Sequence, residues 1–215
     1  MKIVDLSHPL ENGMPVFPGD PPPAFAVQGD LAAGDAASLT HVTMTTHTGT
    51  HIDGPAHVFS EGWRTDGGDL SPFIGRGAVV DCRMFQEGER IPVGIFQQQD
   101  LSKAEFILLY CGWDKHWGTE QFFGNYPVLS AQAAKYLARM EHLKGVGVEY
   151  GSIDPLDDHS LTLHRILLGK GKGVVENLCN LDALLGREFL FCALPLKFKT
   201  GEASPVRAVA MLDWD

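Results

Sequence analysis

The sequence predicts an α/β fold with a mixed sheet, built as a single domain over residues 1–215. Three observations lead to this prediction. Short apolar runs of strand length recur along the chain, and continuous runs of this kind are typical of a sheet covered on both faces. Two segments carry apolar residues at helical spacing. The composition, 44% hydrophobic and 20% charged over 215 residues, suits one globular domain with its own core.

The expected strands are short and outnumber the expected helices. The first is 2–6, KIVDL, and the segment 38–47, SLTHVTMTTH, is rich in β-branched residues and alternates as a strand does. The stretch 9–23 is rich in proline and glycine, so we expect a loop or an irregular arm there. Buried-looking strands are expected at 77–82, 105–111, 145–149, 173–176, 189–194 and 206–212.

Two helices are expected in the second half of the chain. The clearer one covers 130–143, with Ser130 as its N-cap and a stop at Lys144-Gly145. The shorter one covers 160–168, SLTLHRILL, with Ser160 as its N-cap and an end at Gly169.

Composition also excludes some classes of partner. The net charge of −10 argues against a nucleic-acid partner, because phosphate binding depends on clustered Lys and Arg. No apolar run approaches the roughly 18 residues of a membrane span, so no membrane association is expected. The first residues, MKIVDLSHPLENG, resemble neither a signal peptide nor a transit peptide, and we expect a cytoplasmic protein. No CxxC motif indicates a thiolate zinc site or a redox centre.

The stretch 47–57, HTGTHIDGPAH, gathers three histidines and one aspartate within eleven residues. The glycines, the proline and the β-branched residues of this stretch all oppose a helix. On an extended segment, residues two apart share a side, so His51 and Asp53 should lie together while Ile52 faces the core. A bend at Gly49 would let His47 join them, because glycine tolerates backbone angles that other residues avoid.

Imidazole and carboxylate groups without a thiolate are typical of zinc or manganese sites. Three protein ligands leave a coordination position open, which is the arrangement of a catalytic metal rather than a structural one. Other side chains could complete the site, and spacing alone does not choose among them. These are His116, His142, His159, His164, Glu149, Asp154, Asp157, Asp158 and Glu176. Among them, Glu176 ends a buried-looking strand, where an unpaired carboxylate would cost several kcal/mol.

At this point the residues resemble a known family. HTGTHIDGPAH is similar to the H-x-G-T-H-x-D-x-P-x-H signature of the putative cyclase family, which includes bacterial kynurenine formamidases and isatin hydrolases. The resemblance covers nearly the whole chain, in order. It includes DLSHPLENGMPVFPGDPP, LLYCGW, SIDP, HRILL, VVENLCNLDAL and FCALPLKFKTGEASPVRAVAM.

The resemblance implies a swivelling β/β/α fold, usually assembled as a homodimer or homotetramer, and a divalent-metal site of one or two ions. His47, His51 and Asp53 would bind the first ion. In two-metal members the aspartate bridges to a second ion, which His164 and Glu176 would complete here.

The same resemblance implies roles for two further residues. His57 would donate and accept protons rather than bind the metal. At the position where kynurenine formamidases of the family carry a tryptophan that packs on the aromatic substrate, this sequence has Phe17, which keeps an aromatic face but loses the indole N–H.

Arg64 and Arg207 are candidates to bind a substrate or product carboxylate, although for each a solvated surface position is the simpler interpretation.

These observations predict a metal-dependent hydrolase of small molecules. A metal-activated water would attack the carbonyl of an amide, formamide, lactam or lactone, and His57 would carry the proton. Two alternatives remain open: lactone or polyketide-type cyclase chemistry at the same site, and a metal-binding protein without catalysis. His57 favours an enzyme over a metal-binding protein without catalysis, because a mere binding site needs no proton shuttle beside an open coordination position.

Overall fold

The computed structural model describes residues 1–214. One large sheet organises the chain, formed by β1 (Lys2–Asp5), β4 (His51–Asp53), β5 (Ile74–Asp81), β7 (Phe106–Tyr110), β9 (Gly145–Val148), β10 (Gly173–Glu176), β11 (Phe189–Cys192), β12 (Ala203–Pro205) and β13 (Val209–Leu212). The strand order is β1-β13-β11-β5-β7-β9-β10-β4-β12. The central strands β5, β7, β9 and β10 are parallel, and the flanking pairs are antiparallel. The predicted α/β fold with a mixed sheet is therefore confirmed.

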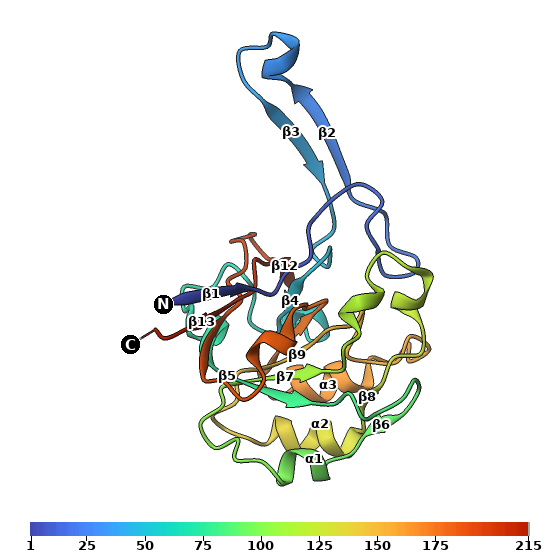
Figure 1. Ribbon diagram of the computed structural model, residues 1–215, viewed down its shortest axis with the longest axis vertical. Coiled ribbons are helices and arrows are strands. Elements are labelled where there is room, and N and C mark those ends of the chain that lie inside the picture. The colour runs from blue at the N-terminus through green and yellow to red at the C-terminus, as the bar shows by residue number, and fades with distance from the viewer. Residues whose placement is uncertain (215) are drawn as a thin grey trace.

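The central strands are apolar on both faces because both faces are covered. In β7, Ile107 and Leu109 belong to one apolar cluster, whereas Phe106 and Leu108 belong to the other. The first cluster lies against α1 (Gly94–Gln97), α2 (Ala131–Ala138) and α3 (Thr162–Leu168), and Figure 1 shows α1 and α2 below the sheet. No helix among the described residues is long and apolar enough to cross a membrane.

Helix α2 begins where the sequence predicts and ends earlier. The Ser130 side chain accepts the N–H of Ala133 at 3.1 Å, so the predicted N-cap is confirmed. The helix stops at Ala138 rather than at residue 143. The carbonyls of Met140 and Leu143 instead accept bonds from the Lys172 ammonium, at 2.8 and 2.6 Å, which satisfies them without further helical turns.

Helix α3 has a different cap from the predicted one. Ser160 does not cap it; the residue before the helix is Leu161, in the left-handed region at φ 53°. The first N–H groups are satisfied from farther away, because the Asp154 carboxylate accepts bonds from Leu163 and His164 at 2.6 and 3.1 Å. This cap depends on the loop between β9 and α3, which local helix signals do not reveal.

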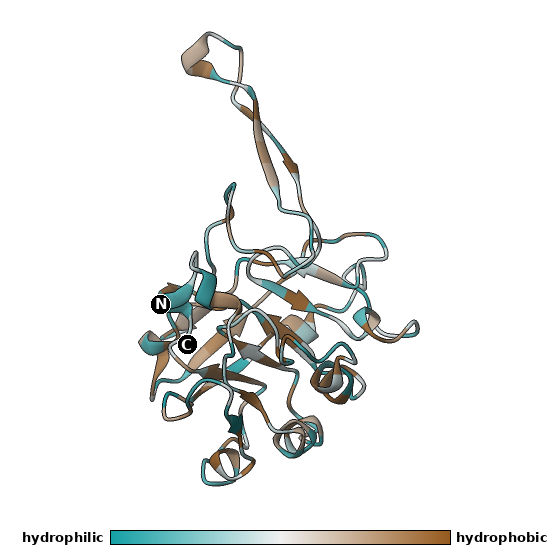
Figure 2. Ribbon diagram, turned by 90° about the vertical axis from the view of Figure 1, so that its right-hand side faces the viewer, coloured by the Kyte–Doolittle hydropathy of each residue, from teal (hydrophilic) through white to brown (hydrophobic). Residues whose placement is uncertain are grey.

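The predicted strand at 38–47 is only partly correct. Residues Leu39–Thr43 form β3, which pairs with β2 (Ala24–Gly29) and not with the large sheet. This hairpin extends as a long arm away from the body of the molecule (Figure 1), and apolar residues recur along it (Figure 2). Strands β2 and β12 and the short parallel pair β6 (Arg90–Ile91) and β8 (Val128–Leu129) were not predicted from the sequence. Short 3-10 helices span Leu31–Ala33, Pro55–His57, Ser71–Phe73, Asp114–His116, Glu120–Phe123 and Leu181–Leu184.

Candidate metal centre

The signature stretch supplies β4, which lies between β10 and β12 in the large sheet. Ile52 is fully buried in the apolar cluster on the face away from the helices. Because neighbouring residues of a strand point to opposite faces, His51 and Asp53 share the other face, and both are buried. The extended segment and its alternation are as the sequence predicted.

A turn at Gly49 brings His47 back over the strand. Gly49 has φ 64°, and a Cβ at this position would lie 2.4 Å from the Leu10 side chain, so only glycine fits without rearrangement. After this turn, His47 Nδ1 lies 2.9 Å from Asp53 Oδ1. The bend expected from the sequence is therefore present.

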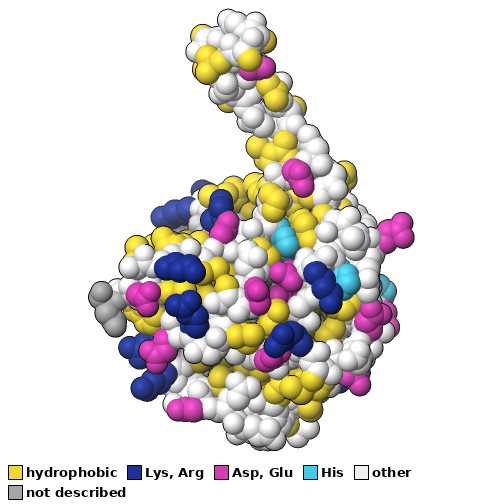
Figure 3. Space-filling model, viewed as in Figure 1, with side chains coloured by type: hydrophobic (Ala, Val, Ile, Leu, Met, Phe, Trp, Pro, Cys, Tyr) yellow, Lys and Arg dark blue, Asp and Glu magenta, His cyan; other side chains and the backbone are white. Residues whose placement is uncertain are grey.

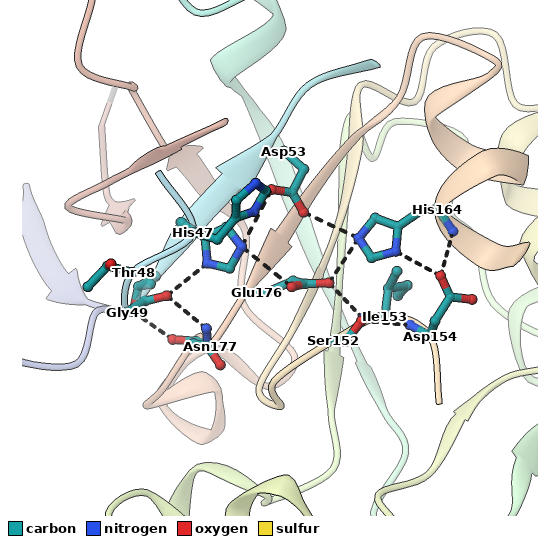
Figure 4. A network of polar contacts seen from close by, with 12 residues as sticks. His47, Thr48, Gly49, Asp53, Ser152, Ile153, Asp154, His164, Glu176 and Asn177 are labelled. Atoms are coloured by element: carbon teal, nitrogen blue, oxygen red, sulfur yellow. Dashed lines mark hydrogen bonds and ion pairs between the residues drawn. The ribbon is translucent and has the colours of Figure 1, made fainter. Parts of the chain in front are cut away.

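Two residues distant in sequence complete the cluster. Glu176, the last residue of β10, is directly opposite His51 in the strand register, and its Oε2 lies 3.4 Å from His51 Nε2. His164, near the start of α3, places Nε2 3.3 Å from Asp53 Oδ2 and 3.2 Å from Glu176 Oε1. Figure 4 shows Asp53, Glu176 and His164 converging from β4, β10 and α3.

The cluster offers two sets of metal-ligand atoms that share one aspartate. His47, His51 and Asp53 form one set, and Asp53, His164 and Glu176 form the other, with the atoms of each set within 4.8 Å of one another. Of the nine candidate side chains that spacing could not separate, only His164 and Glu176 belong to these sets within residues 1–214. Glu149 instead accepts the backbone N–H groups of Cys111, Gly112 and Trp113.

The donor atoms of this cluster fit a divalent cation. His51 Nε2 and Asp53 Oδ1 are buried, and neither has a well-directed hydrogen bond to any described residue. Buried polar atoms without partners are costly and uncommon in proteins. A cation between them would satisfy both, and mixed imidazole and carboxylate donors suit zinc or manganese.

Neighbouring acceptors orient two of the histidines. His51 Nδ1 lies 2.9 Å from the Gly49 carbonyl, and His164 Nδ1 lies 2.7 Å from Asp154 Oδ2. Each acceptor engages one ring nitrogen, so that Nε2 faces the carboxylates of the cluster. Asp154, one of the candidate ligands from the sequence, thus lies behind His164 and also caps its helix.

The carboxylates and imidazoles of the cluster each shift the pKa of the other toward the charged form. Burial acts to raise the pKa of Glu176, but the nearby imidazoles of His164 and His51 outweigh it and lower that pKa to about 2. For His51, burial acts to lower the pKa, and the charges of Asp53 and Glu176 overcome this and raise it to about 9. Because a metal binds neutral imidazole, a cation entering this cluster displaces protons, so its affinity must depend on pH.

His57 lies beside the cluster without belonging to either set of ligand atoms. It ends the 3-10 helix Pro55–His57, and its ring centre lies 4.4 Å from that of His47 and 5.4 Å from that of His164. Burial lowers the pKa of His57, against the opposing charge of Asp53. A neutral imidazole therefore lies at the edge of the ligand cluster at neutral pH.

Phe17 lies on the irregular proline-rich segment, as expected, with 37% of its surface exposed. Its ring meets Phe123 edge-on, with centres 6.1 Å apart.

Glu202, which was not among the residues predicted from the sequence, places Oε1 3.6 Å from His47 Nε2. Glu202 directly precedes β12, and only the pairing of β12 with β4 brings it to the cluster. No local spacing signal could have revealed that neighbour.

Comparison with known proteins agrees with this geometry. The family described as "Putative cyclase" matches residues 4–155. A kynurenine formamidase of Bacillus cytotoxicus is 32% identical over 206 residues, covering 96% of this chain and 95% of that protein. One from Bacillus anthracis is 31% identical over 208 residues, covering 97% and 96%.

Solved structures show the same fold. Isatin hydrolase A from Labrenzia aggregata, bound to benzyl benzoate, superposes with a TM-score of 0.87 at 25% identity, covering 98% of this chain and 93% of that one. Isatin hydrolase A from Ralstonia solanacearum gives a TM-score of 0.88 at 23% identity, covering 99% and 92%. The matched residues and the full-length likeness to these relatives place this chain in the "Putative cyclase" family.

Proposed function

We propose that this protein is a metal-dependent hydrolase that cleaves a small amide, formamide or lactam. The observation that carries the proposal is the pair of metal-ligand sets that share Asp53. Two buried atoms of these sets, His51 Nε2 and Asp53 Oδ1, have no well-directed hydrogen bond within residues 1–214. Relatives named kynurenine formamidase and isatin hydrolase are, by these names, hydrolases of a formamide and of isatin. Their likeness to this chain supports hydrolysis of a C–N bond here.

His47, His51, Asp53, His164 and Glu176 would hold one or two ions, of zinc or manganese. When bound, such an ion would supply Lewis-acid chemistry, making a water more acidic, with a pKa toward roughly 7, and polarising the substrate carbonyl. The carboxylates of Asp53 and Glu176 would neutralise the positive charge within a buried site, where uncompensated charge is costly. The Gly49 carbonyl and Asp154 fix the two buried imidazoles and reduce the reorganisation needed during reaction.

His57 would move the proton. Its lowered pKa keeps the imidazole neutral at neutral pH, so the ring can accept a proton from the attacking water. The same ring can then donate that proton to the leaving nitrogen. Its place outside both ligand sets leaves its nitrogens available for this role.

Homo-oligomer formation, as a dimer or tetramer, belongs to the same proposal. The β2–β3 arm exposes Val27, Leu31, Leu39 and Val42, which are 72, 62, 58 and 43% exposed. Apolar side chains line this projecting arm in Figure 3. A two-stranded hairpin is marginally stable alone, so packing against a second copy would stabilise it.

Phe17 would form an aromatic wall for the substrate. Phe17→Ala is expected to raise KM for an aromatic amide about 2- to 12-fold, because one aromatic contact contributes about 0.5–1.5 kcal/mol beyond buried area. Metal content should not change, because Phe17 lies outside both ligand sets. The KM of an aliphatic amide, measured on the same variant, is the control. Equal KM changes for both substrates, or none, would contradict the proposed wall.

The two arginines suggested for binding a substrate carboxylate have other partners in the described chain. Arg207 forms two bonds with the Asp5 carboxylate, at 2.8 and 2.6 Å. Arg64 donates to the carbonyls of Thr200 and Ser60. The proposal therefore assigns neither of them to the substrate.

Elemental analysis of the purified protein tests the proposal directly. It should be combined with hydrolysis assays on N-formylkynurenine, isatin and simple lactones, with and without added zinc or manganese. One or two metals per chain, with turnover of the formamide or the lactam, is the expected result. Turnover confined to lactones would favour the lactone chemistry considered above. A protein that holds no metal after reconstitution would refute the proposal.

A further inference from the structure

A carboxylate outside the two ligand sets faces the histidine that opens the signature stretch. The backbone carbonyl of Glu202 accepts the N–H of Gly54 at 2.9 Å, and the next residue, Ala203, pairs with Asp53. These contacts hold Glu202 beside the end of β4. Its Oε1 accepts a bond from Thr46 Oγ1 at 2.6 Å and lies 3.6 Å from His47 Nε2.

His47 is the least restrained histidine of the cluster. Its side chain is 22% exposed, whereas those of His51 and His164 are each 3% exposed. It lies on a turn between the projecting arm and β4, not within a strand or helix. The two buried histidines each have an acceptor at 2.9 Å or less on the ring nitrogen that faces away from the carboxylates of the cluster.

For His47, the group on this side of the ring is the Glu202 carboxylate. Nδ1 of His47 faces Asp53 at 2.9 Å, which leaves Nε2 directed toward Glu202. Metal-binding histidines commonly donate their second ring N–H to a carboxylate, which fixes the tautomer and orientation of the ring. The 3.6 Å separation is beyond a hydrogen bond, but the Glu202 side chain is 35% exposed, which leaves it room to rotate toward the ring.

We propose that Glu202 is a positioning residue for His47, anchored by Thr46, and that it raises the metal affinity of the site. This inference rests on the proposed metal-dependent function. Glu202 is not itself a ligand in this proposal, because it belongs to neither set of ligand atoms within 4.8 Å of one another. Its role is to restrain His47, which lies on a turn and is only partly buried.

The test is the metal affinity of Glu202→Gln, measured by competition with a chelator. Loss of an outer carboxylate typically weakens metal binding about 10- to 100-fold, and we expect at least about a 10-fold loss. Thr46→Val, which removes the anchoring hydrogen bond, should shift the affinity in the same direction by less. Glu61→Gln, the same charge change at an exposed carboxylate, is the matched control and should stay within about 2-fold of wild type.

Two further measurements separate positioning from other roles. The thermal midpoint of the metal-free variant should equal that of the metal-free wild type; an affinity loss matched by lost metal-free stability would indicate a merely structural role and overturn the inference. With saturating cobalt(II), the absorption spectrum of Glu202→Gln should match that of the wild type. A spectrum with altered coordination would make Glu202 a ligand and overturn positioning.

Failure of this inference can be distinguished from failure of the proposed function. If the wild type binds metal and Glu202→Gln binds it equally well, only the role of Glu202 is refuted. If the wild type binds no metal, the proposed function is refuted, and this inference with it.

Discussion

His57→Ala is expected to abolish most turnover while leaving the metal in place. Proton transfer by a positioned side chain typically contributes about 10²–10⁴-fold to rate, so kcat should fall by that order. Metal content should persist because His57 belongs to neither ligand set, although its ring lies only 4.4 Å from that of His47. The measurement is kcat together with metal stoichiometry on the same preparation.

A suitable control is His41→Ala, which removes an exposed histidine from strand β3 of the arm. This variant should retain both turnover and metal. If His57→Ala lost its metal, His57 would be a ligand and not a proton shuttle. If it kept both metal and full turnover, proton transfer would have to be assigned to another group.

Glu176→Gln is expected to empty the site or nearly so. Its carboxylate faces both His51 and His164, at 3.4 and 3.2 Å, and no other described carboxylate apart from Asp53 belongs to the ligand sets. An amide is neutral and a weak donor to metals, so affinity should fall by at least about 100-fold, the upper end of the loss seen for outer partners. Metal content at sub-stoichiometric supply measures this effect.

Glu149→Gln provides the matched control for that experiment. Glu149 is also fully buried and also accepts backbone N–H groups, but it lies outside both ligand sets. Burial raises the pKa of Glu149 to about 8, so the neutral amide resembles its protonated form at pH 7. This variant should bind metal as the wild type does. Equal metal binding by Glu176→Gln would exclude Glu176 from the site.

The sequence by itself determined the features that depend on local periodicity and backbone chemistry. Alternation in HTGTHIDGPAH placed His51 and Asp53 on one face of a strand with Ile52 on the other, and Gly49 supplied the turn that returns His47. The same local rules identified Ser130 as a cap and the apolar strands of a sheet covered on both faces. These features follow from neighbours within a few residues, where sterics and side-chain direction decide the outcome.

Only the tertiary structure decided which distant residues complete the cluster. By spacing, His164 and Glu176 were two of nine candidates, and the family resemblance, not periodicity, favoured them. Strand register places Glu176 opposite His51 and Glu202 beside His47, while the packing of α3 brings in His164. The tertiary structure also decided where the strand predicted at 38–47 lies: it pairs with β2 in the projecting arm and not with the large sheet. Pairing between segments more than a hundred residues apart depends on register and on competing partners, which no local pattern encodes.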